Sequence, residues 1–367
     1  MEIERDIAAI TLPRWGHVEP QLTDVVPYAV VDDEGRQVEP ISGYLRDFLA
    51  CGNRPSSTRS YAYSLLRWWH FLLAVGVPWN RATPAEGRDY VLWLAQALKP
   101  IAQRRAESAG RINPITRKQY PGDRYQPRTI RNGNAVVRAF YEFWIELGAG
   151  PLPNPMPLRD PDQRANAHHN PMKPFPAQGR LRYTPPAPRR RPRLMPDERW
   201  QEFFAALRSH RDRALVCLAI STGARANELL GLTGVDVNWG EMLVCVQRKG
   251  SEARQWLPTS PEAFVWLRLY LAEIGEVGPN DALWRTMRRY DDDGRREHCR
   301  LTYDALRAVF RRANATLGTN WTMHDLRHTC AVRMLRDGNL SLRDVQVILG
   351  HAHLARPRST WSKTMMS

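Results

Sequence analysis

The stretch STGARANELLGL, residues 221–232, decides how the second half of the chain folds. Its glycine, Gly223, is predicted to end one helix, and the next helix opens with Arg225 in its first turn. A guanidinium group at the start of a helix favours a bound anion, because the free backbone N–H groups and the helix dipole add to its charge. An arginine near a helix start is more often an ordinary surface residue. This motif therefore gains weight only from its companions.

Two companions lie further along the chain. Lys249 stands at the predicted tip of a hairpin over residues 241–258, a position from which an amine can deliver a proton. His324 and Arg327 stand in TMHDLRHT, where an i, i+3 spacing puts both on one helical face. A hairpin lysine is usually solvated, and HxxR is common by chance. The ordered set is far more specific than its members.

A third companion is His351, which follows Gly350; the glycine is predicted to end a helix and let the imidazole turn inward. The i, i+4 spacing of His324 and His328 also suits a metal ion. However, there is no glutamate in an HExxH position and no evident third ligand, so we expect neither a metal site nor a cofactor.

Helical periodicity surrounds these motifs. The second domain is predicted to span residues 197–367, with a helix start at Asp197 and Glu198. We expect further helices near residues 200–207, 213–220, 261–274, 303–317, 324–337 and 341–349, with the hairpin over 241–258 as the sheet.

The first half predicts a helical bundle over residues 39–155. Its four amphipathic helices are expected from Ile41 to Leu49, from Ser57 or Thr58 to Leu73, over 85–98, and over 128–147. Residues 1–38 are predicted to be an irregular arm with one strand near residues 25–31. A basic stretch between the third and fourth helices, Arg104 to Arg124, fits a DNA-facing loop or a solvated insertion equally well.

A linker rich in proline and arginine is predicted over residues 156–196, because such a composition cannot build a core. It ends in a cluster of arginines that fits either contact with a phosphate backbone or simple solubility: Arg189, Arg190, Arg191 and Arg193.

Composition narrows the class of partner. The 367 residues carry 53 Lys+Arg against 38 Asp+Glu, a net charge of +15, which points to a polyanion and first to nucleic acid. The five cysteines are widely spaced, which argues against a disulfide framework or a zinc ribbon. No apolar run approaches the ~20 residues of a membrane helix, and no secretory signal is evident. We therefore expect a cytoplasmic protein that makes no membrane contact.

Together the motifs resemble those of the tyrosine recombinase (phage integrase) family, and the resemblance extends over residues 41–355. It is carried by Thr222-Gly223-Ala224-Arg225 with Glu228-Leu229, by Lys249-Gly250, by His324 to Thr329, and by Leu349-Gly350-His351. These are similar to the first arginine box, the catalytic lysine, the second box and the last histidine motif of the family. The helical bundle resembles its core-binding domain.

The resemblance implies a mainly α, two-domain fold: a SAM-like four-helix core-binding bundle, and an α+β catalytic domain that is mostly helical with a small antiparallel sheet. It implies metal-free strand exchange on double-stranded DNA, by a dimer or tetramer assembled on that DNA. Arg225 and Arg327 would hold the nonbridging phosphate oxygens. Lys249 would protonate the leaving 5′-oxygen, with His324 as acid/base or hydrogen-bond donor and His351 supporting the phosphate. His328 would be structural.

The family's nucleophilic tyrosine has no counterpart. It would lie about nine residues beyond His351, where this chain has Thr360 beside Trp361, and no tyrosine follows Tyr303. We therefore expect a chain that binds DNA and keeps the phosphate pocket but cleaves poorly or not at all. A truncated or frameshifted reading, a decayed mobile-element integrase, and a tyrosine supplied by a partner recombinase all fit, and the alternative function is that of a non-catalytic DNA-binding accessory protein. The target sequence, and the choice between integration, transposition and resolution, stay open.

Overall fold

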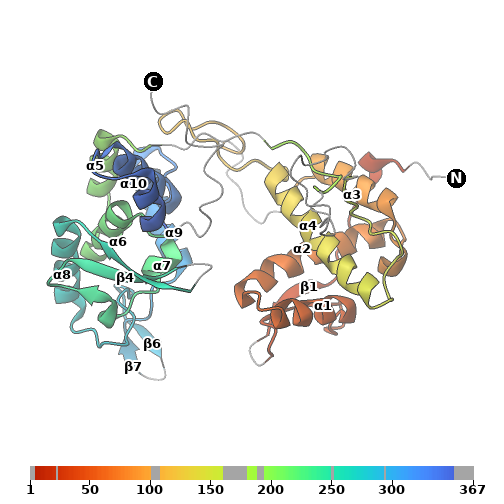
Figure 1. Cartoon of the computed structure of the whole chain (residues 1–367), viewed down its shortest axis with the longest axis horizontal. Helices are drawn as coiled ribbons and strands as arrows, with labels where there is room; N and C mark the ends of the chain where they lie inside the picture. Colours follow the sequence, from red (N-terminus) through yellow and green to blue (C-terminus); the bar gives the residue numbers. More distant parts are fainter. Residues whose placement is uncertain are drawn as a thin grey trace, which may run out of the picture. The chain divides into compact units, whose positions relative to one another are not determined.

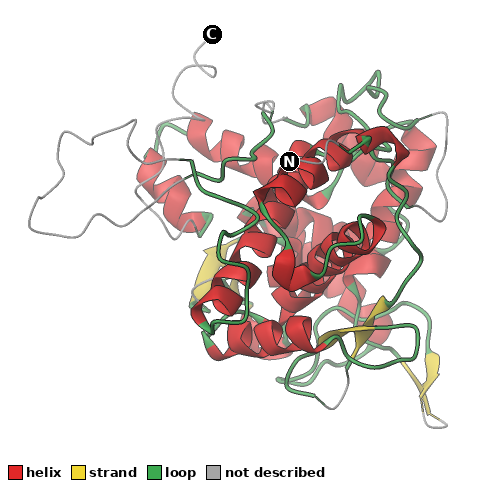
Figure 2. Cartoon of the chain, turned by 90° about the vertical axis from the view of Figure 1, so that its right-hand side faces the viewer, coloured by secondary structure: helices red, strands yellow, loops and turns green. Residues whose placement is uncertain are grey.

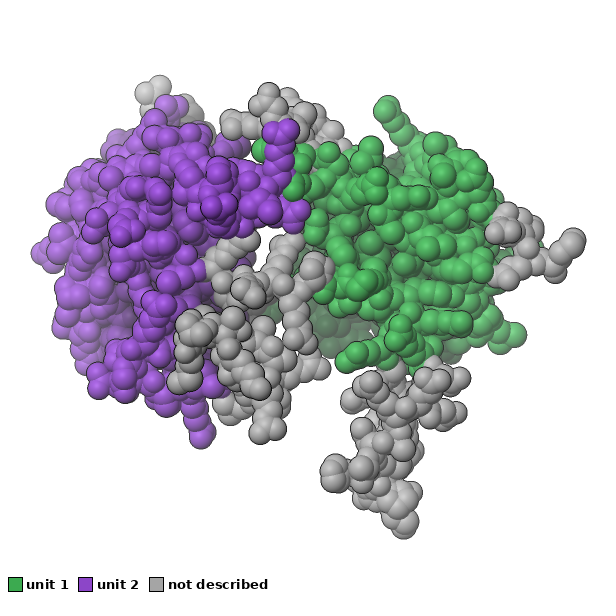
Figure 3. Space-filling model, turned by 90° about the horizontal axis from the view of Figure 1, so that it is seen from above, with its two compact units in different colours: residues 1–110, 121–189 green, residues 111–120, 190–367 purple. Residues whose placement is uncertain are grey.

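The computed structural model describes residues 5–21, 24–100, 108–159, 180–187, 194–248, 252–292 and 295–350. The chain forms two compact units, shown in two colours in Figure 3. Unit 1 comprises Met1–Gly110 and Pro121–Arg189, and unit 2 comprises Arg111–Tyr120 and Arg190–Ser367. The described residues are mostly helical, with small antiparallel sheets (Figure 2). This confirms the predicted fold class.

Unit 1 is built on four helices, labelled in Figure 1: α1 (Glu39–Ala50), α2 (Pro55–Ala74), α3 (Pro84–Gln96) and α4 (Pro127–Glu146). These match the four predicted helices to within a few residues. Three of them begin at a proline, whose fixed φ suits the first helical position and whose missing N–H would be unpaired there anyway. Aromatic rings fill the core between the helices, with Trp68, Phe71, Tyr90, Phe140 and Tyr141 fully buried. Short 3₁₀ turns lie at Ile7–Ala9 (η1) and Trp79–Arg81 (η2).

Residues 1–38 are more ordered than predicted. The structure has two strands there, β1 (His17–Pro20) and β2 (Tyr28–Val31), paired antiparallel with His17 opposite Val31. Only β2 had been expected. β1 is mostly exposed, so it carries no apolar alternation, and the backbone hydrogen bonds to β2 define it instead. Val26 and Val30 are buried in the core of unit 1.

The described ends of the predicted linker 156–196 also pack against cores. Met156 is buried in the core of unit 1, and Tyr183 packs on the same core. Met195 is buried in unit 2, where its backbone N–H donates to Thr329 Oγ1 at 2.9 Å. Single apolar residues in this proline-rich stretch, Met156, Tyr183 and Met195, thus attach its described ends to the two cores. The composition of the stretch does not indicate these contacts.

Unit 2 surrounds one buried helix, α6 (His210–Thr222), which packs against α8 (Pro261–Ile274) and α10 (Met323–Arg336). Residues 214–220 of α6 are buried without a break, as expected for a helix enclosed by others. The remaining helices are α5 (Asp197–Ala205), α7 (Ala226–Leu230), α9 (Tyr303–Leu317) and α11 (Leu342–Ile348). No described helix is long and apolar enough to cross a membrane.

The predicted hairpin is present as β4 (Leu243–Gln247) and β5 (Arg254–Pro258), paired antiparallel with Cys245 opposite Trp256. Two features of the sheets were missed. A two-residue strand, β3 (Val237–Asn238), follows a 3₁₀ turn at Gly234–Asp236 (η4) and adds to the edge of β4. A second hairpin joins β6 (Tyr290–Asp292) to β7 (Arg295–Glu297); the Asp-Gly pair between these strands is a common hairpin signal.

Candidate functional site

Arg225 lies where the sequence analysis placed it, between α6 and α7. Gly223 ends α6 in the left-handed region at φ 63°, and Arg225 is the N-cap of α7. The Arg225 Nη1 donates to Glu228 Oε1 at 2.7 Å, and its backbone N–H donates to Glu228 Oε2 at 2.8 Å. The Arg225 side chain keeps 33% of its exposure. One end of this guanidinium is therefore fixed while part of it faces solvent.

Arg327 lies one turn into α10 and is buried, with 8% exposure. Its Nη1 donates to Gly223 O at 2.5 Å and its Nη2 donates to Leu349 O at 2.6 Å. Burial, and next the charge of Arg225, lower the pKa of Arg327 to about 10. The guanidinium remains charged at neutral pH, and its hydrogen bond to Gly223 O attaches it to the backbone two residues before Arg225.

Arg248 and Glu228 complete this group, and the sequence analysis gave neither a role. Arg248 is 4% exposed; its Nη1 donates to Glu228 Oε2 at 3.0 Å and its Nε donates to Gln255 Oε1 at 2.8 Å. Burial lowers the pKa of Arg248. Glu228 was recognisable as the third residue of α7, where a carboxylate caps the helix start. Nothing in the sequence distinguishes Arg248 from a surface arginine.

Charge at this group is unbalanced. Among the described residues, Arg225 and Arg248 both pair with the carboxylate of Glu228, whereas the printed hydrogen bonds of the Arg327 guanidinium go to the backbone carbonyls of Gly223 and Leu349. Burying cations without matching anions is costly. The surplus positive charge therefore favours an anionic ligand at the exposed side of Arg225.

Side chains also close the C-terminal end of α11. Three successive backbone carbonyls accept hydrogen bonds there: Val347 O from Gln255 at 3.2 Å, Ile348 O from Arg248, and Leu349 O from Arg327. Cationic donors at this end of a helix satisfy its free carbonyls and oppose its dipole. The contacts fix the end of α11 against the arginine group, immediately before Gly350 and His351.

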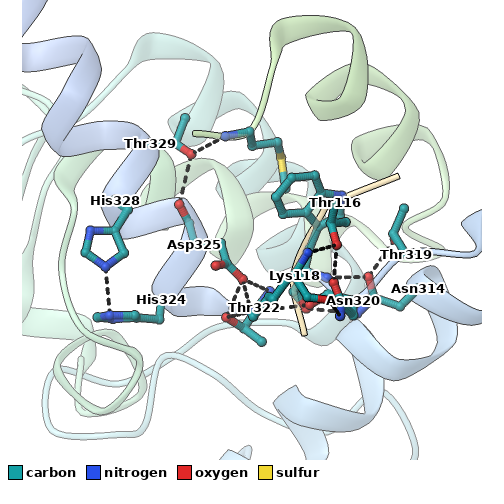
Figure 4. A network of polar contacts seen from close by, with 12 residues as sticks. Thr116, Lys118, Asn314, Thr319, Asn320, Thr322, His324, Asp325, His328 and Thr329 are labelled. Atoms are coloured by element: carbon teal, nitrogen blue, oxygen red, sulfur yellow. Dashed lines mark hydrogen bonds and ion pairs between the residues drawn. The ribbon is translucent and has the colours of Figure 1, made fainter. Parts of the chain in front are cut away.

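His324 lies in the first turn of α10 and is exposed. Its Nε2 is 2.8 Å from Nε2 of His328, and the two rings meet edge to face at 76°. One nitrogen must donate and the other accept, so the tautomers of the pair are linked. Burial, and next the charge of His324, lower the pKa of His328. His328, assigned a structural role from the sequence, is thus the hydrogen-bonded neighbour that orients His324 (Figure 4).

The other predicted site residues lie outside the described part of the chain: Lys249, His351, Arg189, Arg190, Arg191 and Arg193. Lys249 directly follows Arg248 in the connection between β4 and β5, and His351 directly follows Gly350. Within the described ranges no three His, Cys, Asp or Glu side chains are grouped so as to hold a metal ion.

Parts of the chain are similar in sequence to known proteins. The sequence model of the phage integrase family matches residues 193–358. The chain is 34% identical over 149 residues to tyrosine recombinase XerD of Pseudomonas aeruginosa, covering 40% of this chain and 47% of the relative. It is 33% identical over 194 residues to tyrosine recombinase XerC of Azotobacter vinelandii, covering 48% and 60%. The chain therefore spans about half the length of these relatives.

Solved structures share the fold at low identity. The Tn1549 transposon integrase in complex with circular intermediate DNA has a TM-score of 0.56 at 14% identity, covering 86% of this chain and 92% of that one. A lambda integrase dimer bound to a COC′ core site has a TM-score of 0.56 at 15% identity, covering 90% and 80%. Residues 193–358 therefore form a domain of the phage integrase family, and the solved integrase structures share the fold of the chain.

Proposed function

We propose that the protein is a site-specific DNA recombinase by descent, which binds duplex DNA and holds one phosphodiester against Arg225 and Arg327. The observation that carries the proposal is the cationic charge of this group, in which Arg225 and Arg248 share the carboxylate of Glu228 and the buried Arg327 is held by backbone carbonyls. A DNA phosphate is an anion of the right charge, and guanidinium forks match its oxygens.

The roles of the remaining groups follow from this placement. Arg225 and Arg327 contact the nonbridging oxygens and offset the charge of the pentavalent transition state. Lys249 protonates the leaving 5′-oxygen, and His324 acts as acid/base or hydrogen-bond donor. His351 supports the phosphate. Arg189, Arg190, Arg191 and Arg193 lie along the DNA backbone, and no metal or cofactor takes part.

Binding is tested by fluorescence anisotropy with a labelled duplex over a range of salt. Six to ten phosphate contacts would lower the affinity roughly 10³- to 10⁵-fold between 50 and 200 mM salt. Arg225→Gln should weaken binding and reduce the salt slope by about 1, as expected for one lost phosphate contact. The matched control is Arg307→Gln, which removes an equal charge from the exposed Arg307–Asp304 pair on α9. Equal effects of both variants, or salt-insensitive binding, would refute the phosphate site.

We further propose that these 367 residues form no covalent DNA adduct by themselves, since Thr360 stands where the family resemblance places the nucleophilic tyrosine. Tyr303 is the first residue of α9 and is half exposed, which fits a surface position better than a nucleophile. A nicked suicide duplex, analysed for SDS-resistant adducts, tests this. Wild type should shift the duplex without an adduct, whereas Thr360→Tyr should produce one that the double variant with Arg225→Gln loses. An adduct formed by wild type alone would refute the proposal.

Partners and location extend the proposal. The lambda integrase structures include a dimer on a core site and a tetramer on a Holliday junction, and we propose that this chain likewise assembles as a dimer or tetramer on DNA. We also propose that the chain acts in the cytoplasm. If the adduct appears only when an intact tyrosine recombinase is added, the chain acts with a partner; if it never appears, the protein is a non-catalytic DNA-binding accessory factor.

A further inference from the structure

A segment from the middle of the first half of the chain belongs to unit 2. Residues 111–120 lie between α3 and α4 in sequence, yet they fold with the residues that follow position 190. The segment is a tight reversal in which Ile112 pairs with Gln119 and Asn113 N–H donates to Lys118 O at 2.9 Å. Asn113 is 1% exposed and Thr116 6%. The sequence predicts a DNA-facing loop or a solvated insertion here, and the structure adds that two polar side chains of the segment are buried while Arg111 and Arg117 are exposed.

The segment is held by polar contacts to the connection between α9 and α10 (Figure 4). Asn113 Nδ2 donates to Gly318 O at 2.7 Å, and Thr116 Oγ1 donates to Asn320 Oδ1. Asn320 Nδ2 in turn donates to Lys118 O at 3.1 Å. Paired hydrogen bonds in both directions fix the register of the segment against this connection.

Lys118 then reaches the start of α10. Its Nζ donates to Asp325 Oδ2 at 2.5 Å, to Thr322 Oγ1 at 3.2 Å and to Asn320 O at 3.4 Å. The Asp325 carboxylate is 5% exposed and caps the helix, accepting from Thr322 N–H at 2.8 Å and from Thr322 Oγ1 at 2.6 Å. Lys118 therefore neutralises a buried carboxylate that holds the first turn of α10.

The choice of lysine fits this geometry. The chain has 53 basic residues, of which five are lysine. Three oxygens from three residues converge on the Lys118 amine, and an ammonium group has three rotatable donors, whereas the donors of a guanidinium are fixed in one plane. Arginine at position 118 would keep the charge but could not reach all three oxygens in the same way.

We propose that Lys118 is a positioning residue for the His324–His328 pair, and that residues 111–120 are a working part of the phosphate site although they precede its domain in sequence. His324 directly precedes Asp325 in the first turn of α10. His328 lies one turn later, and its ring contacts the ring of His324. By fixing Asp325, Lys118 fixes the helix start that presents His324. The proposal rests on the proposed function in assuming that His324 acts on a bound phosphate.

The test compares Lys118→Met and Lys118→Arg with wild type in the full chain. Lys99→Met is the matched control, since it removes an equal charge whose amine donates to Gly122 O in unit 1. Fold is checked by circular dichroism. Lys118 is partly exposed, at 28%, and Thr322 still binds Asp325 without it, so the methionine variant should fold.

Two readouts need no DNA. Amide exchange in the first turn of α10 should be about 5- to 30-fold faster in Lys118→Met than in wild type and intermediate in Lys118→Arg. Titration of the histidine ring protons by NMR, assigned with His324→Gln and His328→Gln, reports the pair itself. Burial and the charges of His324, Arg327 and Lys118 lower the pKa of His328, and Asp325 raises it; without the lysine charge one lowering contribution is lost, and the pKa of His328 should rise. Lys118→Arg should keep that pKa close to wild type, and Lys99→Met should change neither readout.

The proposal is overturned if Lys118→Met leaves both the exchange of α10 and the histidine titration as in wild type, or if Lys99→Met changes them equally. DNA affinity is then measured with the same variants and should fall in Lys118→Met more than in Lys99→Met. If wild type itself binds no DNA, the proposed function fails while the first two readouts still decide whether Lys118 positions the histidine pair.

Discussion

Replacing Gly223 by alanine should damage the arginine site, and a second glycine provides the comparison. Gly223 and Gly318 both end helices of unit 2 in the left-handed region, at φ 63° and φ 65°. A Cβ on Gly318 would lie 3.7 Å from Ile115 Cδ1, an ordinary contact. A Cβ on Gly223 would lie 2.6 Å from Leu349 Cδ2 and 3.1 Å from Cys330 Sγ. The two variants therefore share the backbone strain and differ in the steric clash.

The expected magnitudes follow from this difference. An alanine in the left-handed region costs about 1–2 kcal/mol, which should be the whole effect of Gly318→Ala. Overpacking a buried site adds roughly 1–3 kcal/mol, because Leu349 and Cys330 are themselves almost fully buried, at 3% and 2% exposure. At about 2–4 °C per kcal/mol for a domain of this size, Gly223→Ala should melt ~2–12 °C below Gly318→Ala.

The same clash should reach the function. Gly223 O and Leu349 O are the two carbonyls to which Arg327 donates, so displacing either moves the guanidinium. Thermal unfolding followed by circular dichroism measures the stability, and anisotropy with a labelled duplex measures the affinity. Equal melting temperatures for the two alanine variants, or equal DNA affinities, would refute the reasoning that this close approach holds the site together.

Three further outcomes are expected. Arg248→Met should destabilise unit 2 by about 3–5 kcal/mol, the range for breaking a buried ion pair, and a urea melt that matches wild type would contradict it. Tyr141→Phe should destabilise unit 1 by about 1–3 kcal/mol, since the hydroxyl accepts from Trp68 Nε1 at 2.9 Å and donates to Trp79 O at 2.8 Å; the same melt followed by tryptophan fluorescence checks this. Burial raises the pKa of two of the three buried thiols, Cys217 and Cys330, to about 12, so neither forms thiolate at pH 8. Iodoacetamide should label the exposed Cys51 first, and rapid labelling of Cys330 in the folded protein would be the contrary result.

Apolar periodicity in the sequence predicts most of the helices. The helices of both units show strong apolar periodicity, and the structure has them within a few residues of their predicted bounds. β1 and β3 escaped because an edge strand of two to four residues has too few side chains to show a pattern, and pairing with a neighbour defines it. Residues 111–120 belong to unit 2 because they contact residues more than 200 positions later in the sequence. A local sequence pattern cannot predict contacts of that range.

The candidate site divides in the same way. Arg225, His324 and Arg327 stand in short motifs with a recognisable order, so the sequence was enough to select them. Arg248 and Lys118 differ from other basic residues only in what surrounds them: a buried glutamate and helix carbonyls for one, a buried aspartate for the other. Burial and long-range partners give these residues their importance, and both properties belong to the folded chain.

Residues 111–120 precede the rest of unit 2 in the sequence. This position matters when fragments or chimeras of such proteins are made. The family match begins at residue 193, so a fragment excised along that border, or grafted onto the first half of a relative, leaves behind the lysine that neutralises Asp325. Such a chimera would keep the arginine and histidine motifs of this chain but lose the ion pair between Lys118 and Asp325 at the start of α10. Unit 2 is assembled from two separate stretches of sequence, residues 111–120 and 190–367. A single cut near residue 193 therefore divides the unit.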